Sequence, residues 1–112
     1  MTHRLILQPE AEADLDEAYH WYEKQCRGLG AQFIEYVEAV LERIGQRPEL
    51  HAVAYRNVRQ TLVKRFPYVV CYVFEENEVE VVAVFHAHRD PTVWKSRVGR
   101  HPTGSSDASD DN

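Results

Sequence analysis

The stretch that decides the fold runs from residue 58 to residue 90 and reads VRQTLVKRFPYVVCYVFEENEVEVVAVFHAHRD. It contains three runs rich in β-branched and aromatic residues, with signs of the alternation typical of half-buried strands: Val58–Phe66, Tyr68–Glu75 and Val79–His88. Pro67 separates the first two runs, and Glu76-Asn77 fits a tight hairpin turn between the second and the third. The stretch therefore predicts a three-stranded meander.

The residues before this stretch predict one strand and two helices. Arg4–Leu7 is short and aliphatic, as in a strand. Pro9 then stands where a helix can begin, because proline is tolerated in the first helical turn. Two apolar stripes with helical spacing follow; the first ends at Gly28 and Gly30, and the second runs from Phe33 to Ile44. We expect the two helices to pair as an antiparallel hairpin.

The predicted fold class is α+β, in the order β-α-α-β-β-β with a short final helix. The helical hairpin is expected to pack on one face of a small, mostly antiparallel sheet. The length of 112 residues suits one domain, which we assign to residues 1–99. Asp90-Pro91 can open the short helix, which would run through Trp94. Residues 100–112 are mainly Pro, Gly, Ser and Asp and are predicted to form a disordered acidic tail.

The net charge of -5 is distributed unevenly along the chain. Residues 1–50 carry five Lys or Arg and ten Asp or Glu, whereas residues 51–100 carry eight and five. This acidic balance argues against a strong non-specific nucleic-acid binder but allows a local anion site. No apolar run is long enough to span a bilayer, and we expect no signal peptide. We therefore expect a cytoplasmic protein without membrane contacts, in which Cys26 and Cys71 are reduced, mostly buried thiols.

The alternation of strand residues predicts which polar side chains share a sheet face. Arg59 and Arg65 are expected on one face of their strand, where their donor forks could bind phosphate or carboxylate or lie solvated at the surface. The last strand is expected to present four residues on one face: Val82, Val84, His86 and His88.

The two histidines allow several kinds of chemistry. His86 and His88 could be two metal ligands, but nothing at sequence distance completes the set, so we expect neither a metal nor a cofactor. They could instead transfer protons near neutral pH, or make structural hydrogen bonds at the strand end. Trp21 is expected to serve in helix packing.

Five short motifs follow one another along the chain: Pro9-x-Ala11-x-x-Asp14-Leu15, Arg47-Pro48, Val58-Arg59, Phe66-Pro67-Tyr68 with Tyr72, and His86-x-x-Arg89-Asp90. In this order and spacing they resemble the RelE/ParE toxin superfamily of type II toxin–antitoxin systems, and the ParE-like branch in particular. The resemblance extends over residues 4–97, which is nearly the whole chain outside the tail.

The resemblance implies a toxin with a cognate antitoxin, which wraps an extended or helical segment around it in a hetero-oligomer. ParE-like members poison DNA gyrase, so the resemblance implies a non-enzymatic protein that binds this target and causes growth arrest, as in plasmid-stabilisation modules. Our candidate residues for target or anion binding are Arg59, Arg65, Tyr72, Arg89 and Trp94.

RelE-like members cleave messenger RNA on the ribosome, and this activity is the alternative. Their lysine-rich early strand is missing here, since Lys64 is the only lysine between residues 25 and 94. A metal-independent ribonuclease would use His86 or His88 as base or acid, while Arg59, Arg65 or Arg89 would stabilise the developing charge. A non-toxic binding module of the same fold is a further alternative.

Overall fold

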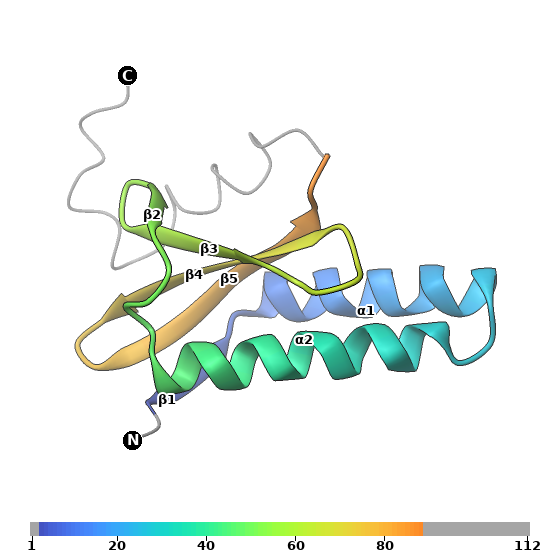
Figure 1. The fold of residues 1–112 in the computed structure, drawn as a ribbon, viewed down its shortest axis with the longest axis horizontal. Coiled ribbons are helices and arrows are strands. Elements are labelled where there is room, and N and C mark those ends of the chain that lie inside the picture. The colour runs from blue at the N-terminus through green and yellow to red at the C-terminus, as the bar shows by residue number, and fades with distance from the viewer. Residues whose placement is uncertain (1–2, 89–112) are drawn as a thin grey trace.

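The computed structural model describes residues 3–88, in which two helices cover a five-stranded sheet (Figure 1). The elements follow in the order β1 (Arg4–Leu7), α1 (Pro9–Gln25), α2 (Leu29–Gln46), β2 (Val53–Tyr55), β3 (Val58–Leu62), β4 (Tyr68–Glu75) and β5 (Glu78–His86). The predicted order is confirmed, and β2 is an additional short strand. The predicted final helix, the tail and the candidate residues Arg89 and Trp94 lie outside the described residues.

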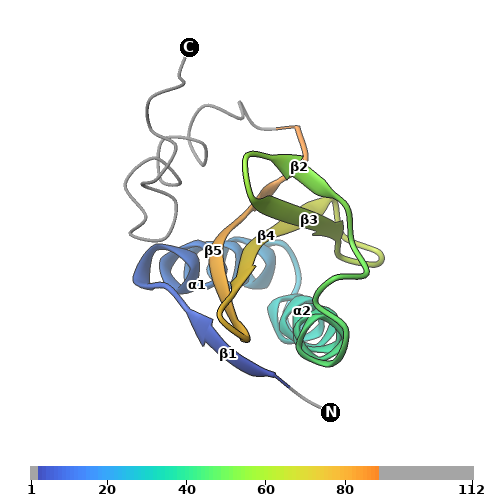
Figure 2. The same ribbon diagram turned by 90° about the vertical axis from the view of Figure 1, so that its left-hand side faces the viewer.

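The strands are arranged in the order β1-β5-β4-β3-β2. β1 runs parallel to β5, and the other neighbouring pairs are antiparallel. α1 and α2 lie side by side on one face of the sheet (Figure 2). Glu76 and Asn77 both have positive φ angles, as the tight turn between β4 and β5 requires. The predicted α+β class, with a helical hairpin on a mostly antiparallel sheet, is therefore confirmed.

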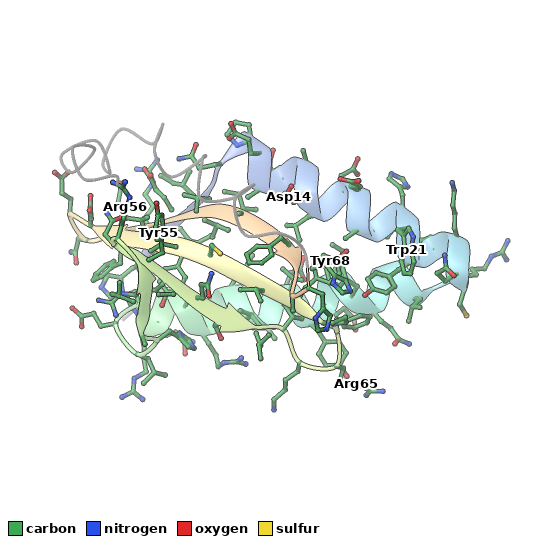
Figure 3. All side chains as sticks on the ribbon, turned by 90° about the horizontal axis from the view of Figure 1, so that it is seen from above. Asp14, Trp21, Tyr55, Arg56, Arg65 and Tyr68 are labelled. Atoms are coloured by element: carbon green, nitrogen blue, oxygen red, sulfur yellow. The ribbon has the colours of Figure 1, made fainter. Side chains whose placement is uncertain are left out.

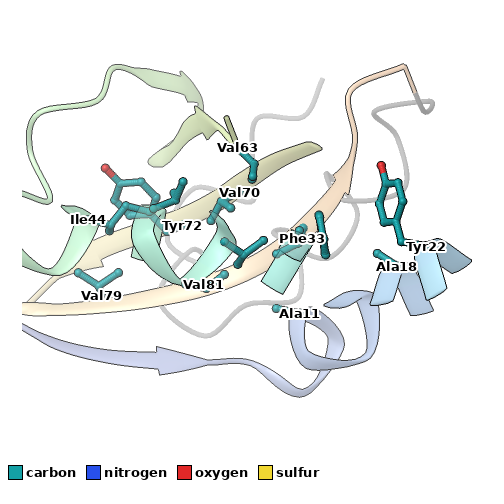
Figure 4. Close-up of a cluster of buried hydrophobic side chains, with 13 residues drawn as sticks. Ala11, Ala18, Tyr22, Phe33, Ile44, Val63, Val70, Tyr72, Val79 and Val81 are labelled. Carbon is teal, nitrogen blue, oxygen red and sulfur yellow. The ribbon is translucent and has the colours of Figure 1, made fainter. Parts of the chain in front are cut away.

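The main core lies between the helices and the sheet (Figure 4). α2 contributes the largest apolar stripe, which consists of Phe33, Val37, Val40 and Ile44. These side chains pack against buried residues of the two central strands: Val70, Tyr72, Val79, Val81 and Val84. Burying each such side chain contributes roughly 1.5–3 kcal/mol, so this layer holds most of the stabilising contacts.

Aromatic rings join the Phe66-Pro67-Tyr68 motif to the helical hairpin. The Phe33 ring centroid lies 5.3 Å from that of Phe66 and 5.0 Å from that of Tyr68. The Tyr22 ring lies 5.1 Å from Phe66 and 5.3 Å from Phe33. Three of these pairs meet edge-on, and Tyr22 with Phe33 is tilted at 34°. An edge-on aromatic pair stabilises by roughly 0.5–1.5 kcal/mol beyond the area it buries. The turn between β3 and β4 is thus held on both helices.

The opposite face of the sheet is also apolar, and its residues form a second buried cluster: Val58, Val69, Cys71, Val73, Val82, Ala83 and Phe85. Cys71 is buried here, as predicted, whereas Cys26 is exposed where α1 ends, contrary to the expectation of burial. Both thiols are free.

A β-bulge at Val82 changes the predicted faces of β5. Cys71 pairs with Ala83 but the next residue, Tyr72, pairs with Val81, so Val82 is an extra residue on β5. Val81 and Val84 consequently both face the helices, while Val82 belongs to the opposite cluster. The predicted common face of Val82, Val84 and His86 is therefore wrong, because alternation continues only where the pairing has no extra residue.

Two strands end earlier than predicted. β3 ends at Leu62 rather than Phe66, and Arg65 has a φ angle of 70°, which places it in a turn and not on the strand face of Arg59. β5 ends at His86, so His88 follows the strand. In both places a turn breaks the alternation that the sequence alone had extended.

Gly30 was predicted to end the first helix together with Gly28, but this is wrong for Gly30, which lies inside α2. A Cβ atom at Gly30 would stand 2.5 Å from the carbonyl oxygen of Tyr19, so glycine allows the close approach of the two helices. Gly28, with a φ angle of 90°, makes the actual turn. The backbone N–H groups of Gly28 and Ala31 donate to the Glu23 carboxylate, and these bonds lower the pKa of Glu23.

No helix within residues 3–88 combines the length and the apolar character that crossing a membrane requires.

Substitution Gly30→Ala should lower the free energy of unfolding by about 1–3 kcal/mol, because the added methyl group forces α1 and α2 apart. Urea denaturation followed by circular dichroism measures this loss. Gln32→Ala, at an exposed position of the same helix, is the matched control and should change stability by less than about 0.5 kcal/mol. Equal stability of the two variants would contradict the close approach at Gly30.

Candidate functional site

A cavity of about 530 Å³ lies between α1 and the end of the sheet where β5 stops. α1 contributes Asp14, Glu17, Ala18, Trp21 and Tyr22, and the sheet side contributes Pro67, Tyr68, Val84, His86 and His88. Figure 3 labels Asp14 and Trp21 on α1 and Tyr68 on β4. The cavity thus combines aromatic rings, carboxylates and imidazoles, and it is the best candidate for a binding site in the described part of the chain.

Asp14 is placed by the way α1 attaches to β5. The backbone N–H of Gln8 donates to the carbonyl oxygen of Val81 at 3.0 Å, which continues the pairing of β1 with β5. The helix then begins at Pro9 and brings the Asp14 carboxylate to the backbone N–H of Val84, also at 3.0 Å. The carboxylate therefore takes the place of a strand partner for β5 beyond the end of β1.

His86 and His88 are brought together at one side of the cavity. Their ring centroids are 5.4 Å apart, and the His88 backbone N–H donates to Nδ1 of His86 at 3.2 Å. The His86 ring also meets the Tyr68 ring edge-on at 5.4 Å. His86 is half-buried and His88 is exposed. The hydrogen bond agrees with a structural role for the pair at the strand end.

Arg65 does not join the two histidines around the cavity. Its guanidinium donates to the Tyr36 hydroxyl at 3.0 Å and lies 5.6 Å from the Tyr36 ring centroid, so it points toward α2. Figure 3 shows Arg65 at the β3–β4 turn, away from α1. The three candidate catalytic residues therefore reach the same end of the sheet, but only His86 and His88 line the cavity.

Arg59 and Tyr72 lie opposite one another on β3 and β4, farther along the sheet. Tyr72 is four residues from Tyr68 on β4, which is roughly 13 Å at the usual strand rise. The Arg59 guanidinium donates to the carbonyl oxygens of His51 and Glu49, at 2.6 and 3.4 Å. These bonds hold the loop before β2 and occupy donors that were predicted to bind an anion.

Tyr72 is 0% exposed, so its side chain has no surface for direct contact with a target. Its hydroxyl donates to the carbonyl oxygen of Pro48 at 2.7 Å and lies 3.3 Å from Nδ1 of His51. Burial raises the pKa of Tyr72 and, together with Arg43 and Arg59, lowers the pKa of His51. Tyr72 therefore anchors the segment that follows α2.

Several residues of the cavity were not predicted as site residues. Trp21 was expected to pack within the helical layer, yet 55% of its surface is exposed. Asp14, Glu17 and Trp21 follow one another at helical spacing on α1. This spacing could have indicated from the sequence that the three side chains share one face of the helix. Within residues 3–88, no group of three His, Cys, Asp or Glu side chains could hold a metal ion.

Comparison with known proteins gives one family and several relatives. Residues 5–91 match the family described as "ParE toxin of type II toxin-antitoxin system, parDE". The chain is 27% identical to Toxin ParE2 of Mycobacterium tuberculosis over 99 residues, which cover 88% of this chain and 94% of the relative, in both strains CDC 1551 and H37Rv.

Two solved structures share the fold. The first belongs to a chromosomal ParDE system from P. aeruginosa, with a TM-score of 0.70, 16% identity, and coverage of 78% of this chain and 98% of that chain. The second is a doubly substituted E. coli toxin RelE in the free state, with a TM-score of 0.58, 18% identity, and coverage of 87% and 94%. At these identities the similarity concerns the fold alone.

Substitution Asp14→Ala should lower the free energy of unfolding by about 1–3 kcal/mol, because it removes the acceptor of the Val84 N–H. Asp14→Asn keeps a side-chain oxygen and should cost less. Chemical denaturation measures both variants, with exposed Asp16→Ala as the control on the same helix. If Asp14→Ala is no less stable than Asp16→Ala, the carboxylate does not hold α1 on β5.

Substitution Tyr72→Phe should lower the free energy of unfolding by about 0.5–1.5 kcal/mol, because the buried carbonyl of Pro48 loses its donor. Tyr36→Phe removes a hydroxyl from a less buried position and serves as the control. Thermal unfolding followed by circular dichroism compares the two. A Tyr72→Phe variant that is as stable as Tyr36→Phe would contradict the role of the Tyr72 hydroxyl as an anchor for the segment after α2.

Proposed function

The chain belongs to the ParE toxin family of type II toxin–antitoxin systems, and on this premise we propose that it acts in the cytoplasm by binding DNA gyrase and is neutralised by a cognate antitoxin. The family match over residues 5–91 is the observation that carries the proposal, because it includes every described helix and nearly every described strand residue. A solved structure from a chromosomal ParDE toxin–antitoxin system shares the fold of this chain, and this supports an antitoxin as its partner.

The chemistry of the cavity favours protein binding over cleavage of RNA. Asp14 and Glu17 line it beside the two histidines, and their carboxylates would repel a phosphodiester. The Arg65 guanidinium, which would have to stabilise the charge of a cleavage transition state, is bonded to Tyr36 on the other helix. The ribonuclease alternative would need both features to change when RNA binds.

The proposal is tested by expressing the chain without its antitoxin and by assaying the purified protein on gyrase. We expect growth arrest with DNA-damage signalling, and loss of negative supercoiling as the toxin is added to gyrase and relaxed plasmid. Prior mixing with the antitoxin from the neighbouring reading frame should restore supercoiling, and this mixture is the control.

Three outcomes would contradict the proposal in different ways. Normal supercoiling at saturating protein would remove gyrase as the target. Cleaved messenger RNA in arrested cells, abolished by a folded His86→Ala/His88→Ala variant, would establish the ribonuclease alternative. Harmless expression without the antitoxin would indicate a non-toxic binding module of the same fold.

A further inference from the structure

We propose that the cavity between α1 and the end of β5 receives a lysine or arginine side chain from the cognate antitoxin. This inference rests on the proposed function, since it assigns one contact of the partner named there. It is carried by the aromatic walls of the cavity, by its carboxylates and by the charge of the helix that borders it.

Three aromatic rings form the wall that a cation would meet. The Trp21 and Tyr22 ring centroids are 5.0 Å apart at an interplanar angle of 85°, and Tyr22 is 6.1 Å from Tyr68. Tyr22 is buried by its neighbours, whereas 55% of the Trp21 surface remains exposed. A cationic group within about 6 Å of such rings is attracted by their negative faces, most strongly by tryptophan. Trp21 is therefore available to a side chain that enters from a partner.

The carboxylate of Glu17 supplies the opposite charge at the rim. Glu17 lies three residues after Asp14, so both side chains project from the same side of α1 into the lining of the cavity. Glu17 is exposed, and the ion pairs within residues 3–88, Arg4 with Glu78 and His20 with Asp16, do not include it. An incoming ammonium or guanidinium group would find a charge partner there without displacing an internal cation.

The shape of the cavity suits a long side chain with a charged end. Ala18, Val84 and Pro67 give it apolar surface, against which the methylene stem of lysine or arginine can pack. Its volume is about 530 Å³, whereas one water molecule occupies about 30 Å³ in the liquid, so the cavity has room for a long side chain. A purely apolar side chain would leave Glu17 without a partner, and an acidic one would face two carboxylates.

The surrounding charge favours a basic segment as the occupant. α1 carries six Asp or Glu residues and one Lys or Arg, which is Lys24. α2 adds three Glu residues and one Arg to the same helical layer. A field of this sign attracts a positively charged chain and disfavours phosphate. An antitoxin segment that presents Lys or Arg to α1 is therefore the partner that fits this surface.

The test measures binding of the full-length chain to the antitoxin encoded beside it by isothermal titration calorimetry. Glu17→Gln and Trp21→Leu should each weaken binding about tenfold, which corresponds to roughly 1.4 kcal/mol. Glu12→Gln is the matched control, because it makes the same charge change at an exposed position of α1 outside the cavity, and it should change the Kd less than about twofold.

A second arm identifies the partner's side chain. Each Lys or Arg of the antitoxin is replaced by Met, and each replacement is combined with Glu17→Gln in a double-mutant cycle. One replacement should show a coupling free energy with Glu17→Gln. For the other replacements, the binding free-energy changes of the two substitutions should add. The salt dependence of the Kd should also be weaker for Glu17→Gln than for Glu12→Gln.

The outcomes separate this inference from the proposed function. Unchanged affinity of both cavity variants, or no coupled Lys or Arg, would overturn the inference while the toxin–antitoxin pairing stands. Tighter binding by Glu17→Gln would also overturn it, since the carboxylate would then repel the antitoxin segment instead of attracting it. If the unaltered chain does not bind the antitoxin, the proposed function fails and the inference fails with it.

Discussion

Two backbone groups of β5, on either side of one extra residue, hold the helical layer on the sheet. The carbonyl oxygen of Val81 accepts from the N–H of Gln8, and the N–H of Val84 donates to the Asp14 carboxylate. Val82 stands between them as the bulge. Because these bonds satisfy β5 beyond the end of β1, α1 can follow the strand edge without leaving buried backbone groups unpaired. Each residue of the Pro9-x-Ala11-x-x-Asp14 motif therefore has a structural role. Pro9 begins α1, Ala11 is fully buried on this helix, and Asp14 bonds β5.

The bulge also decides what the end of β5 presents. Beyond Val82 the even-numbered residues face the helices, so His86 turns toward Tyr68 and α1. Without the extra residue, Val84 and His86 would point into the opposite apolar cluster. The aromatic contacts of Phe66 with both helices keep the β3–β4 turn close to this place. A site between a helix and a strand end thus arises from one irregularity in the pairing.

Polar residues at the two ends of the sheet have different roles. At one end, Arg59 and Tyr72 bond the carbonyl groups of the segment that follows α2, so their polar atoms serve the fold. At the other end, Trp21, Glu17 and the two histidines line the cavity between α1 and the end of β5. If the proposed antitoxin binds this cavity, its acidic and aromatic lining would form a recognition surface on the helical layer, separate from the buried core.

The sequence by itself determined the order of the elements apart from β2, the α+β class, the hairpin turn at Glu76-Asn77 and the family, because each depends on local patterns or short motifs. It could not determine the bulge at Val82, since that requires the pairing with a distant strand. The role of Gly30 depended on its approach to Tyr19 on another helix, and the direction of Arg65 depended on Tyr36. Asp14 and His86 were visible as residues, but their common cavity was not. Only the tertiary structure brings them together, because contacts between elements follow from packing and register and not from local spacing.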